Sequence, residues 1–287
     1  MYFLKKNHLQ ALYWLFMSML FSCLNDVAMK YLATGLSFMQ ICFFRFALGS
    51  LVLLPLVGCT KNQSWTTQRP WLHFFRGLFL CLAMGLYAYG LTKVEMSTVT
   101  VIGFANPIFV LILARLLLKE QVPWPIWAAT VLAFIGIVLV VSPTRVTCNR
   151  PALACLLATI VFASLDIINK KYVIQESILS MLFFSNVFAG LCMLSCVWYQ
   201  WQMPTAPQLG IMTLLGIGSN LILYFVLKAF QLADAGALAP FRYMELVVSI
   251  GCGYLFFQEW PTLRTCISAG IVIPATCFIA YHQNRRL

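Results

Sequence analysis

The stretch ALAPFRYMELVVS, Ala237 to Ser249, places charged side chains inside a long apolar segment. Arg242 and Glu245 are three positions apart, so one face of a helix would carry both side chains. Charged groups at membrane depth are costly unless they face a partner, a cavity or a solute. Pro240 lacks an amide hydrogen and weakens the helix before them, which is tolerated where backbone lines a cavity. The stretch predicts a polar face that meets a small charged solute; the alternative is an internal ion pair that only fixes helix packing.

The composition around this stretch is that of a membrane protein. Of the 287 residues, 62% are apolar and 9% are charged, and the mean hydropathy is +0.88, whereas a soluble domain carries about 25% charged residues. The net charge of +11 is expected of basic cytoplasmic loops, and no basic run longer than two residues indicates a nucleic-acid partner. Cysteines lie mainly within apolar runs, where they behave as small hydrophobic residues, so we expect no metal site and no cofactor.

Ten segments are long and apolar enough to cross a lipid bilayer, because a spanning helix needs about 20 mostly apolar residues. Short connections join them, and prolines stand at or near several of their starts. The expected fold is therefore an all-α membrane protein with ten transmembrane helices. The segments cover residues 9–31, 38–58, 70–91, 95–117, 122–142, 151–172, 178–199, 208–230, 235–257 and 262–282.

The distribution of lysine and arginine indicates the orientation. If the N-terminus lies in the cytoplasm, the cytoplasmic segment ends carry more of these residues than the outer ends do. An even number of spans then places both termini in the cytoplasm. Arg76 lies near the inner end of its segment, and we expect its side chain to snorkel toward the interface.

The chain also repeats itself. The stretch FSCLNDVAMKYL at 21–32 matches FASLDIINKKYV at 162–173 at an offset of 141 residues. Later pairs keep an offset of 139: Gly77 with Gly216, Asn106 with Glu245, and Glu120 with Glu259. Because each copy holds five segments, the second copy enters the membrane from the opposite side. The pattern predicts an inverted 5+5 repeat, residues 1–145 and 146–287, with a solute site near the midplane between the copies.

The repeat indicates where that site lies. Asn106 in the fourth segment corresponds to Glu245 in the ninth, and Phe104 corresponds to Tyr243. Asn106 precedes Pro107, so we expect an irregular helix whose carbonyl groups are available to a solute. The candidate solute-binding residues are Arg242, Tyr243, Glu245, Asn106, Phe104, Asp166 and Asn169.

Three further polar residues are candidates for gating or coupling. Asn25 and Asp26 lie toward the outer side of the first segment, whereas Arg45 lies about 10 Å inside the second. We expect Arg45 to close a gate with an acid or to attract an anionic group. Asp26, Asp166 and Glu245 are the acids that a proton could couple to transport, and the sequence does not choose among them.

Several motifs carry a resemblance to a known family over essentially the whole chain. Ten segments, two five-segment copies and the pairs Lys119–Glu120 and Gln258–Glu259 resemble the EamA branch of the drug/metabolite transporter superfamily. Within it, the chain is similar to the S-adenosylmethionine uptake transporters of rickettsia-like intracellular bacteria. The matching stretches are NDVAMKYLATGLSF from Asn25, FFRF from Phe43, RPWLHFFRGL from Arg69, LDIINKKYVIQESILSMLFFS from Leu165 and LKAFQLADAGALAPFRYMELVVS from Leu227.

This resemblance implies uptake of S-adenosylmethionine across the bacterial inner membrane, in exchange for S-adenosylhomocysteine. The candidate residues are compatible with that solute, since Arg242 could bind its carboxylate and Glu245 or Asp166 could face its ammonium or sulfonium. Tyr243 and Phe104 could stack on its adenine or its cation. The same residues would suit an amino acid or a quaternary amine, so an exporter of amino acids, amines or drugs stays open.

An enzyme is the alternative of another class. An intramembrane transferase would need a catalytic histidine or acid with an activated partner, and the three histidines lie near segment ends without one. We therefore expect a transporter and no enzyme. The sequence leaves the formation of a homodimer open.

Overall fold

The computed structural model describes residues 2–32, 35–59, 67, 69–91, 93, 96–141, 150–197, 201–258, 260 and 263–286. Within these ranges the regular structure is entirely helical, so the expected all-α class is confirmed. The helices are α1 (Tyr2–Leu32), α2 (Phe38–Cys59), α3 (Pro70–Leu91), α4 (Met96–Gly103), α5 (Asn106–Leu117), α6 (Trp124–Val141), α7 (Arg150–Tyr172), α8 (Ile178–Val197), α9 (Ala206–Leu232), α10 (Ala235–Leu238), the 3₁₀ helix η2 (Ala239–Tyr243), α11 (Met244–Phe257) and α12 (Leu263–Arg286).

Helices occupy all ten expected segments, but not all are long enough to span a membrane. Among the described residues, seven spans meet the requirements of length and apolarity. Trp124–Val138 and Ala269–Phe278 are shorter apolar helices, and the ninth expected segment is divided among α10, η2 and α11. The structure thus supports a membrane protein with seven candidate spans, and the count of ten stays a prediction. The seven are His8–Met29, Phe38–Cys59, Pro70–Gly90, Val99–Leu117, Arg150–Tyr172, Ile178–Val197 and Ala206–Leu232.

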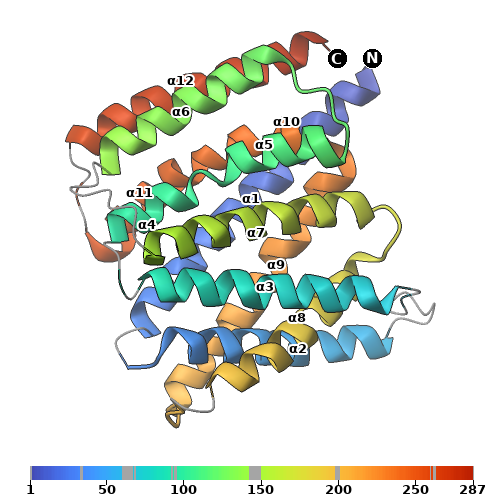
Figure 1. Cartoon of the computed structure of the whole chain (residues 1–287), viewed down its shortest axis with the longest axis vertical. Coiled ribbons are helices and arrows are strands. Elements are labelled where there is room, and N and C mark those ends of the chain that lie inside the picture. The colour runs from blue at the N-terminus through green and yellow to red at the C-terminus, as the bar shows by residue number, and fades with distance from the viewer. Residues whose placement is uncertain are drawn as a thin grey trace.

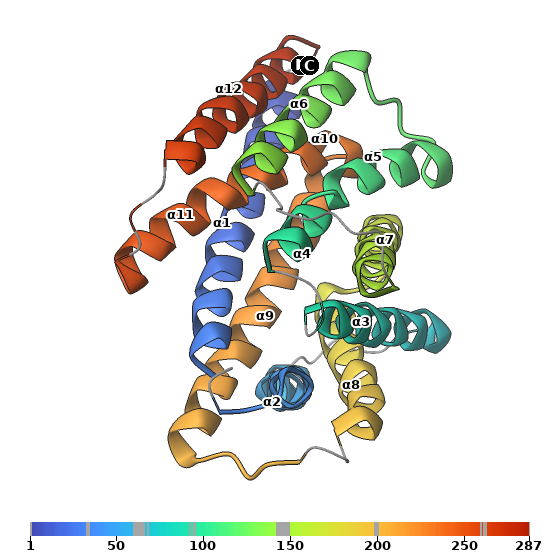
Figure 2. The ribbon, with the colours of Figure 1, turned by 60° about the vertical axis from the view of Figure 1, so that its left-hand side comes forward.

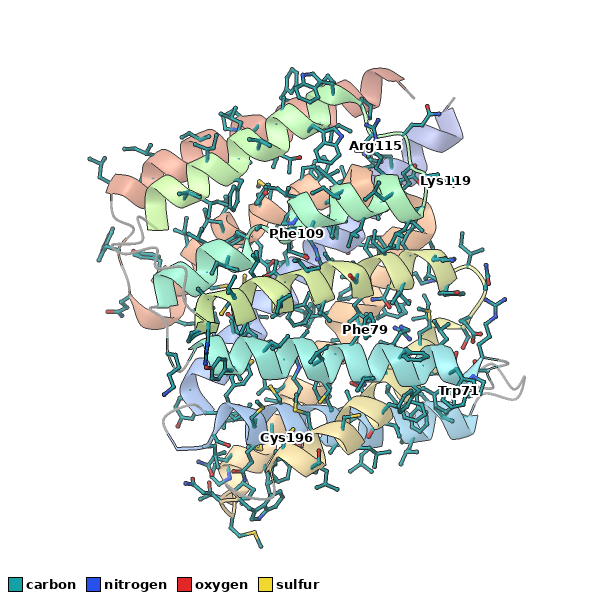
Figure 3. The ribbon with its side chains drawn as sticks, in the orientation of Figure 1. Trp71, Phe79, Phe109, Arg115, Lys119 and Cys196 are labelled. Carbon is teal, nitrogen blue, oxygen red and sulfur yellow. The ribbon has the colours of Figure 1, made fainter. Side chains whose placement is uncertain are left out.

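The helices are arranged in layers. In Figure 1, α6 and α12 form one edge and α2 and α8 the opposite edge, with α3 and α7 between them. Figure 2 shows α1 and α9 running side by side along the length of the molecule. The chain ends lie close together in both views. In Figure 3, the basic residues Arg115 and Lys119, in and just after the last turn of α5, lie on the side of the termini.

The contacts between helices come in matching pairs. Under the sequence offset, α1 corresponds to α7, α2 to α8, α3 to α9, and α4–α5 to α10–α11. The α1–α9 contact then corresponds to α7–α3, and α2–α9 corresponds to α8–α3; both members of each pair are present. The contact of α5 with α7 likewise has its counterpart in that of α11 with α1. The packing therefore follows the same two-fold relation as the sequence repeat.

Two glycines at corresponding positions allow close packing. A Cβ atom added at Gly216 on α9 would lie 2.7 Å from Gly49 N and 3.1 Å from Arg45 O on α2. A Cβ atom added at Gly77 on α3 would clash with Phe188 Cβ on α8. Small residues let membrane helices approach closely in this way, which explains why both copies carry glycine at this position.

We expect Gly216→Val to destabilise the protein by about 1–3 kcal/mol, because the new side chain would collide with the backbone of α2. The measurement is thermal unfolding of the purified protein in detergent. Gly210→Val is the matched control, since Gly210 lies on the same helix and an added Cβ atom meets nothing within 4 Å. Equal melting temperatures for the two variants would contradict this account of the packing.

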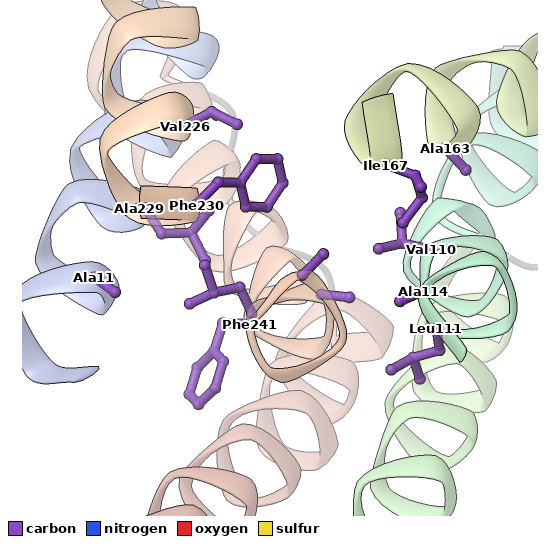
Figure 4. Packing of buried hydrophobic residues seen from close by; sticks show 14 of the residues in the cluster. Ala11, Val110, Leu111, Ala114, Ala163, Ile167, Val226, Ala229, Phe230 and Phe241 are labelled. Carbon is purple, nitrogen blue, oxygen red and sulfur yellow. The ribbon is translucent and has the colours of Figure 1, made fainter. Parts of the chain in front are cut away.

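The largest buried apolar cluster surrounds η2 and joins residues from α1, α5, α7, α9 and η2. In Figure 4, Phe230 and Phe241 lie on one side of the cluster, in α9 and η2. Val110 and Ile167 lie on the other side, in α5 and α7. The cluster therefore fixes the irregular turn of the ninth segment against the helices that carry Asn106 and Asp166.

Candidate functional site

Both of the segments that were expected to be irregular are broken. In the fourth, α4 ends at Gly103 and α5 begins at Asn106, with Pro107 in its first turn. In the ninth, the chain passes from α10 through η2, with Pro240 in its first turn, into α11. Proline is tolerated in a first turn because the amide hydrogens there have no partner within the helix. The expected irregularity before Arg242 and at Asn106 is therefore confirmed (Figure 1).

Three of the predicted residues meet beside these breaks, and we call them the Arg242 cluster: Arg242, Asp166 and Asn106. Arg242 donates a hydrogen bond from a terminal guanidinium nitrogen to Asp166 Oδ2 at 2.5 Å, and the two form an ion pair. Asn106 Nδ2 donates to the same Asp166 oxygen at 3.4 Å. The side chains of Arg242 and Asp166 are 27% and 12% exposed. The cluster thus joins the fourth, sixth and ninth segments through a partly buried charge pair.

An aromatic pair lies at the same breaks. The rings of Phe104 and Tyr243 have centroids 6.5 Å apart and are tilted by 37°. Tyr243 is fully buried, and neither its hydroxyl group nor Asn106 Oδ1 has a hydrogen-bond partner in the described part of the chain. A buried polar atom without a partner costs about 1–3 kcal/mol. Both atoms therefore retain unused hydrogen-bonding capacity. Asn106 contacts the charge pair through Asp166, whereas the Tyr243 ring packs among apolar residues of α6 and α12.

A small pocket of about 10 Å³ adjoins the Arg242 cluster. That volume corresponds to about one water molecule. A larger solute could therefore enter only if the surrounding helices move apart. The pocket is lined by Leu15, Val110, Asp166, Phe230, Leu238 and Arg242, among others.

Glu245 belongs to a second cluster. It lies near enough to Asp26 to act on that carboxylate electrostatically, as Arg45 does, and Asp26 itself is exposed. The Cys23 thiol, on the same helix as Asp26, donates to the backbone oxygen of Glu245 at 3.8 Å. We call Asp26, Arg45 and Glu245 the Glu245 cluster. Arg242 pairs with Asp166 and not with Glu245, and the alternative that such an internal ion pair only fixes helix packing stays open.

Asn25, the neighbour of Asp26, faces a different helix. It is buried, and its Nδ2 atom donates to Leu215 O on α9 at 3.4 Å. A Cβ atom added at Gly218, also on α9, would clash with Asn25 Oδ1. Asn25 therefore packs α1 against α9, while Asp26 belongs to the Glu245 cluster.

The structure corrects the expectation for Arg76. This residue is 1% exposed and does not snorkel. Its Nε donates to Asn169 Oδ1 at 2.9 Å, and a terminal nitrogen donates to Met181 O at 3.0 Å. Hydrogen-bond acceptors from α7 and α8 thus satisfy a charge that would otherwise have to reach the interface. Asn169, predicted to contact the solute, is therefore placed with Arg76 and not with the Arg242 cluster.

The expectation that the histidines lack a partner was wrong for His73. The residue is fully buried, its Nε2 lies 3.5 Å from Glu176 Oε2, and its Nδ1 lies 3.3 Å from Arg76. We call His73, Arg76, Asn169 and Glu176 the Arg76 cluster. A sequence signal was present, since His73 and Arg76 are three positions apart and share a helix face. Their partners follow about one hundred residues later, so no local pattern could identify them.

Glu120 is a further residue whose structural role sequence reasoning missed. Its carboxylate accepts hydrogen bonds from the backbone nitrogens of Ala235, at 3.1 Å, and Gly236, at 2.8 Å, at the start of α10. Burial raises the pKa of this carboxyl group, and the two amide donors oppose that rise. The preceding Lys119 has a φ of 57°, and Gln258, at the corresponding position, has a φ of 53°. Glu259 itself lies outside the described residues.

The described residues contain no group of three or more histidine, cysteine, aspartate or glutamate side chains placed to hold a metal ion. What they do contain is the Arg242–Asp166 ion pair beside two helix breaks. Such an arrangement can bind an ion or a zwitterion near the middle of a membrane protein.

Comparison with known proteins gives consistent matches over almost the full length. The EamA-like transporter family matches twice, at residues 9–142 and 149–281. The S-adenosylmethionine uptake transporter of Rickettsia prowazekii (strain Madrid E) is 42% identical over 98% of this chain and 96% of its own. A riboflavin transporter of Rhizobium johnstonii is 25% identical over 96% of this chain and 92% of its own.

A solved crystal structure also matches, with a TM-score of 0.81 over 96% of this chain and 98% of its own. The sequence identity is 16%, so this likeness concerns the fold alone. The two family matches together span most of the 287 residues. The chain therefore belongs to the EamA-like transporter family.

Proposed function

We propose that this protein is a secondary transporter that takes up S-adenosylmethionine across the bacterial inner membrane, in exchange for S-adenosylhomocysteine, by alternating access. The observation that carries the proposal is the Arg242–Asp166 ion pair at the meeting point of two broken helices. Paired opposite charges suit the carboxylate and ammonium of an amino-acid group. The 42% identity to transporters named for S-adenosylmethionine uptake supports this solute, and the name of those relatives supports uptake as the direction.

The two charges of the pair would change partners when the solute binds. The guanidinium of Arg242 can bind a carboxylate with two parallel hydrogen bonds. Asp166, released from Arg242, would then bind the ammonium group of the same solute. In the absence of solute the two residues neutralise each other, so neither charge is left uncompensated.

The aromatic pair would hold the adenine. Stacking on Phe104 and Tyr243 would bury the base, while the Tyr243 hydroxyl and Asn106 Oδ1 would bond to its polar edge. Glu245 would face the sulfonium, with Asp26 and Arg45 completing a gate or coupling site. Asn25 would hold α1 against α9, and Asn169 would hold α7 against α3. Both residues would therefore position helices and would not contact the solute.

The same proposal includes the topology. We infer ten spans in an inverted 5+5 repeat of residues 1–145 and 146–287, with both termini in the cytoplasm. Matching helix contacts and the two separate family matches support the repeat. The position of Arg115 and Lys119 on the side of the termini supports the orientation. Two copies related in this way would rock around the site to expose it to each side in turn.

We further propose that the protein catalyses no reaction, since its named relatives are transporters. The pocket beside the Arg242 cluster has room for about one water molecule. A pocket this small fits an occluded stage of a transport cycle, in which the helices must move apart before a solute can enter.

Replacing Tyr243 with phenylalanine tests the binding site. We expect the affinity for S-adenosylmethionine to fall about 3- to 10-fold, the effect of one hydrogen bond worth about 0.5–1.5 kcal/mol. Stability without solute should not fall, because the hydroxyl group has no partner in the described structure. Thermal unfolding with and without S-adenosylmethionine measures both quantities.

Tyr254→Phe is the matched control, because Tyr254 lies on the adjoining helix α11 and is 43% exposed. Its affinity should equal that of the unmodified protein. If Tyr243→Phe binds as tightly as this control, the hydroxyl group does not contact the solute. If S-adenosylmethionine stabilises neither protein, the proposed solute is wrong.

A further inference from the structure

The turn between α9 and α10 is held by two charged side chains from other parts of the chain. Lys170 on α7 donates from its ammonium group to Phe230 O and Ala233 O at the end of α9, both at 2.8 Å. The Glu120 carboxylate accepts hydrogen bonds from the first two backbone nitrogens of α10. A cation at the carbonyl end of one helix and an anion at the amide end of the next are both favourable. Asp234 also lies 3.7 Å from the Lys170 ammonium, but it is 69% exposed, so this ion pair contributes little.

Glu120 links the ends of two helices. Its backbone nitrogen donates to Ala114 O in the last turn of α5, at 3.2 Å. The preceding Lys119 is in the left-handed conformation, with a φ of 57°, which is a common way for a helix to end. The backbone of Glu120 is therefore tied to α5, while its side chain is tied to α10. In Figures 1 and 2, α10 lies beside this end of α5.

The same face of α7 also holds Arg242. Asp166, the ion-pair partner of Arg242, and Lys170 are four positions apart on α7. They therefore lie on one side of the helix, about 6 Å apart along its axis. The stretch from α10 to Arg242 is thus attached to α7 near both of its ends, and α5 packs against both α10 and η2.

The stretch between these attachments has little structure of its own. It consists of α10, with four residues, and η2, with five, whereas an isolated helix shorter than about 12 residues is marginal in water. The fit at its start is close, since a Cβ atom added at Gly236 would lie 2.8 Å from Val122 Cγ2 and 3.1 Å from Glu120 Oε2. The position of Arg242 therefore depends on what holds the stretch in place.

We propose that Glu120 and Lys170 are positioning residues for transport. By holding the start of α10 on α5 and α7, they direct the Arg242 guanidinium toward Asp166 and, once the solute is bound, toward the carboxylate of the solute. Neither residue contacts the solute. This inference rests on the proposed function of Arg242 and adds two residues on which the affinity depends.

The test compares S-adenosylmethionine with decarboxylated S-adenosylmethionine, which keeps the adenine, sulfonium and ammonium but lacks the carboxylate. Binding to the full-length protein in detergent is measured by isothermal titration calorimetry. We expect Glu120→Ala to weaken binding of S-adenosylmethionine at least 10-fold and binding of the decarboxylated compound less than 2-fold. The second compound offers Arg242 no carboxylate, so the position of Arg242 matters less to it. A purely structural role would weaken both compounds equally.

Graded variants keep the test informative if Glu120→Ala folds poorly. Glu120→Gln keeps one of the two acceptor oxygens, so we expect S-adenosylmethionine to bind about 3-fold more weakly. Lys170→Met should behave like Glu120→Ala. Lys170→Arg should bind as the unmodified protein does, because a guanidinium also donates to the carbonyls at the end of α9.

Two controls separate position from charge and stability. Lys119→Gly removes an exposed charge beside Glu120, and glycine adopts the left-handed conformation without strain. Gly216→Val loses stability at a site about 21 Å along α9 from Phe230. Both controls should bind both compounds as the unmodified protein does.

The outcomes distinguish this inference from the proposed function. Equal weakening of the two compounds in Glu120→Ala and Lys170→Met, or no weakening of either compound, would overturn the inference. Binding of neither compound by the unmodified protein would overturn the proposed function instead.

Discussion

Replacement of Arg242 with glutamine is expected to lower S-adenosylmethionine uptake at least 100-fold. The variant loses the group proposed to bind the carboxylate, and Asp166 is left partly buried without its ion-pair partner. Breaking a fully buried pair costs about 3–5 kcal/mol. Because these side chains are 27% and 12% exposed, solvent screens part of that cost.

A double variant separates binding from stability. Arg242→Gln combined with Asp166→Asn removes both charges, so we expect stability to recover while uptake stays absent. Arg115→Gln is the control for the loss of one positive charge, since Arg115 is exposed at the end of α5, and its uptake should be unchanged. Normal uptake by the double variant would show that the pair only holds the helices together.

Replacement of Arg76 with methionine is expected to have the largest effect on folding. Arg76 is 1% exposed. Its loss leaves Asn169 Oδ1 and Met181 O without their hydrogen-bond donor, and it leaves the Glu176 carboxylate without the positive charge near it. Removing one partner of a buried charge network costs about 3–5 kcal/mol. We therefore expect little folded protein, measured by size-exclusion chromatography of the detergent-solubilised protein and by its thermal unfolding.

Two further variants test this account of Arg76. Adding Glu176→Gln to Arg76→Met removes the uncompensated acid and should restore part of the lost stability. Arg69→Gln is the control, because Arg69 is exposed at the start of α3, where it bonds to Gln175, and the change should stay within about 0.5 kcal/mol. Equal stability of Arg76→Met and Arg69→Gln would show that the buried contacts contribute little.

Features that depend on local chemistry could be predicted from the sequence. Pro107 and Pro240 marked two helix breaks, since proline removes an amide donor wherever it occurs. The nearly constant sequence offset also identified Gly77 and Gly216, whose close contacts with neighbouring helices correspond. Both inferences rest on properties of single residues or on the repeat itself, and neither requires knowledge of how distant helices pack.

Features that depend on the direction of side chains could not be predicted. Spacing of three positions places Arg242 and Glu245 on one face only if a single helix carries both. The change from 3₁₀ to α geometry at Tyr243 and Met244 alters the rotation per residue, and the two side chains join different clusters. Arg76 was misassigned for a related reason, because its acceptors lie on α7 and α8, far away in sequence.

The central claim is that the Arg242 cluster binds S-adenosylmethionine for exchange, and one measurement tests it most directly. Labelled S-adenosylmethionine is supplied to proteoliposomes that are either empty or preloaded with S-adenosylhomocysteine. The account predicts strong uptake only after preloading, and none in vesicles containing the Arg242→Gln, Asp166→Asn double variant. No uptake under either condition by correctly folded and inserted protein, or equal uptake by the double variant, would contradict it.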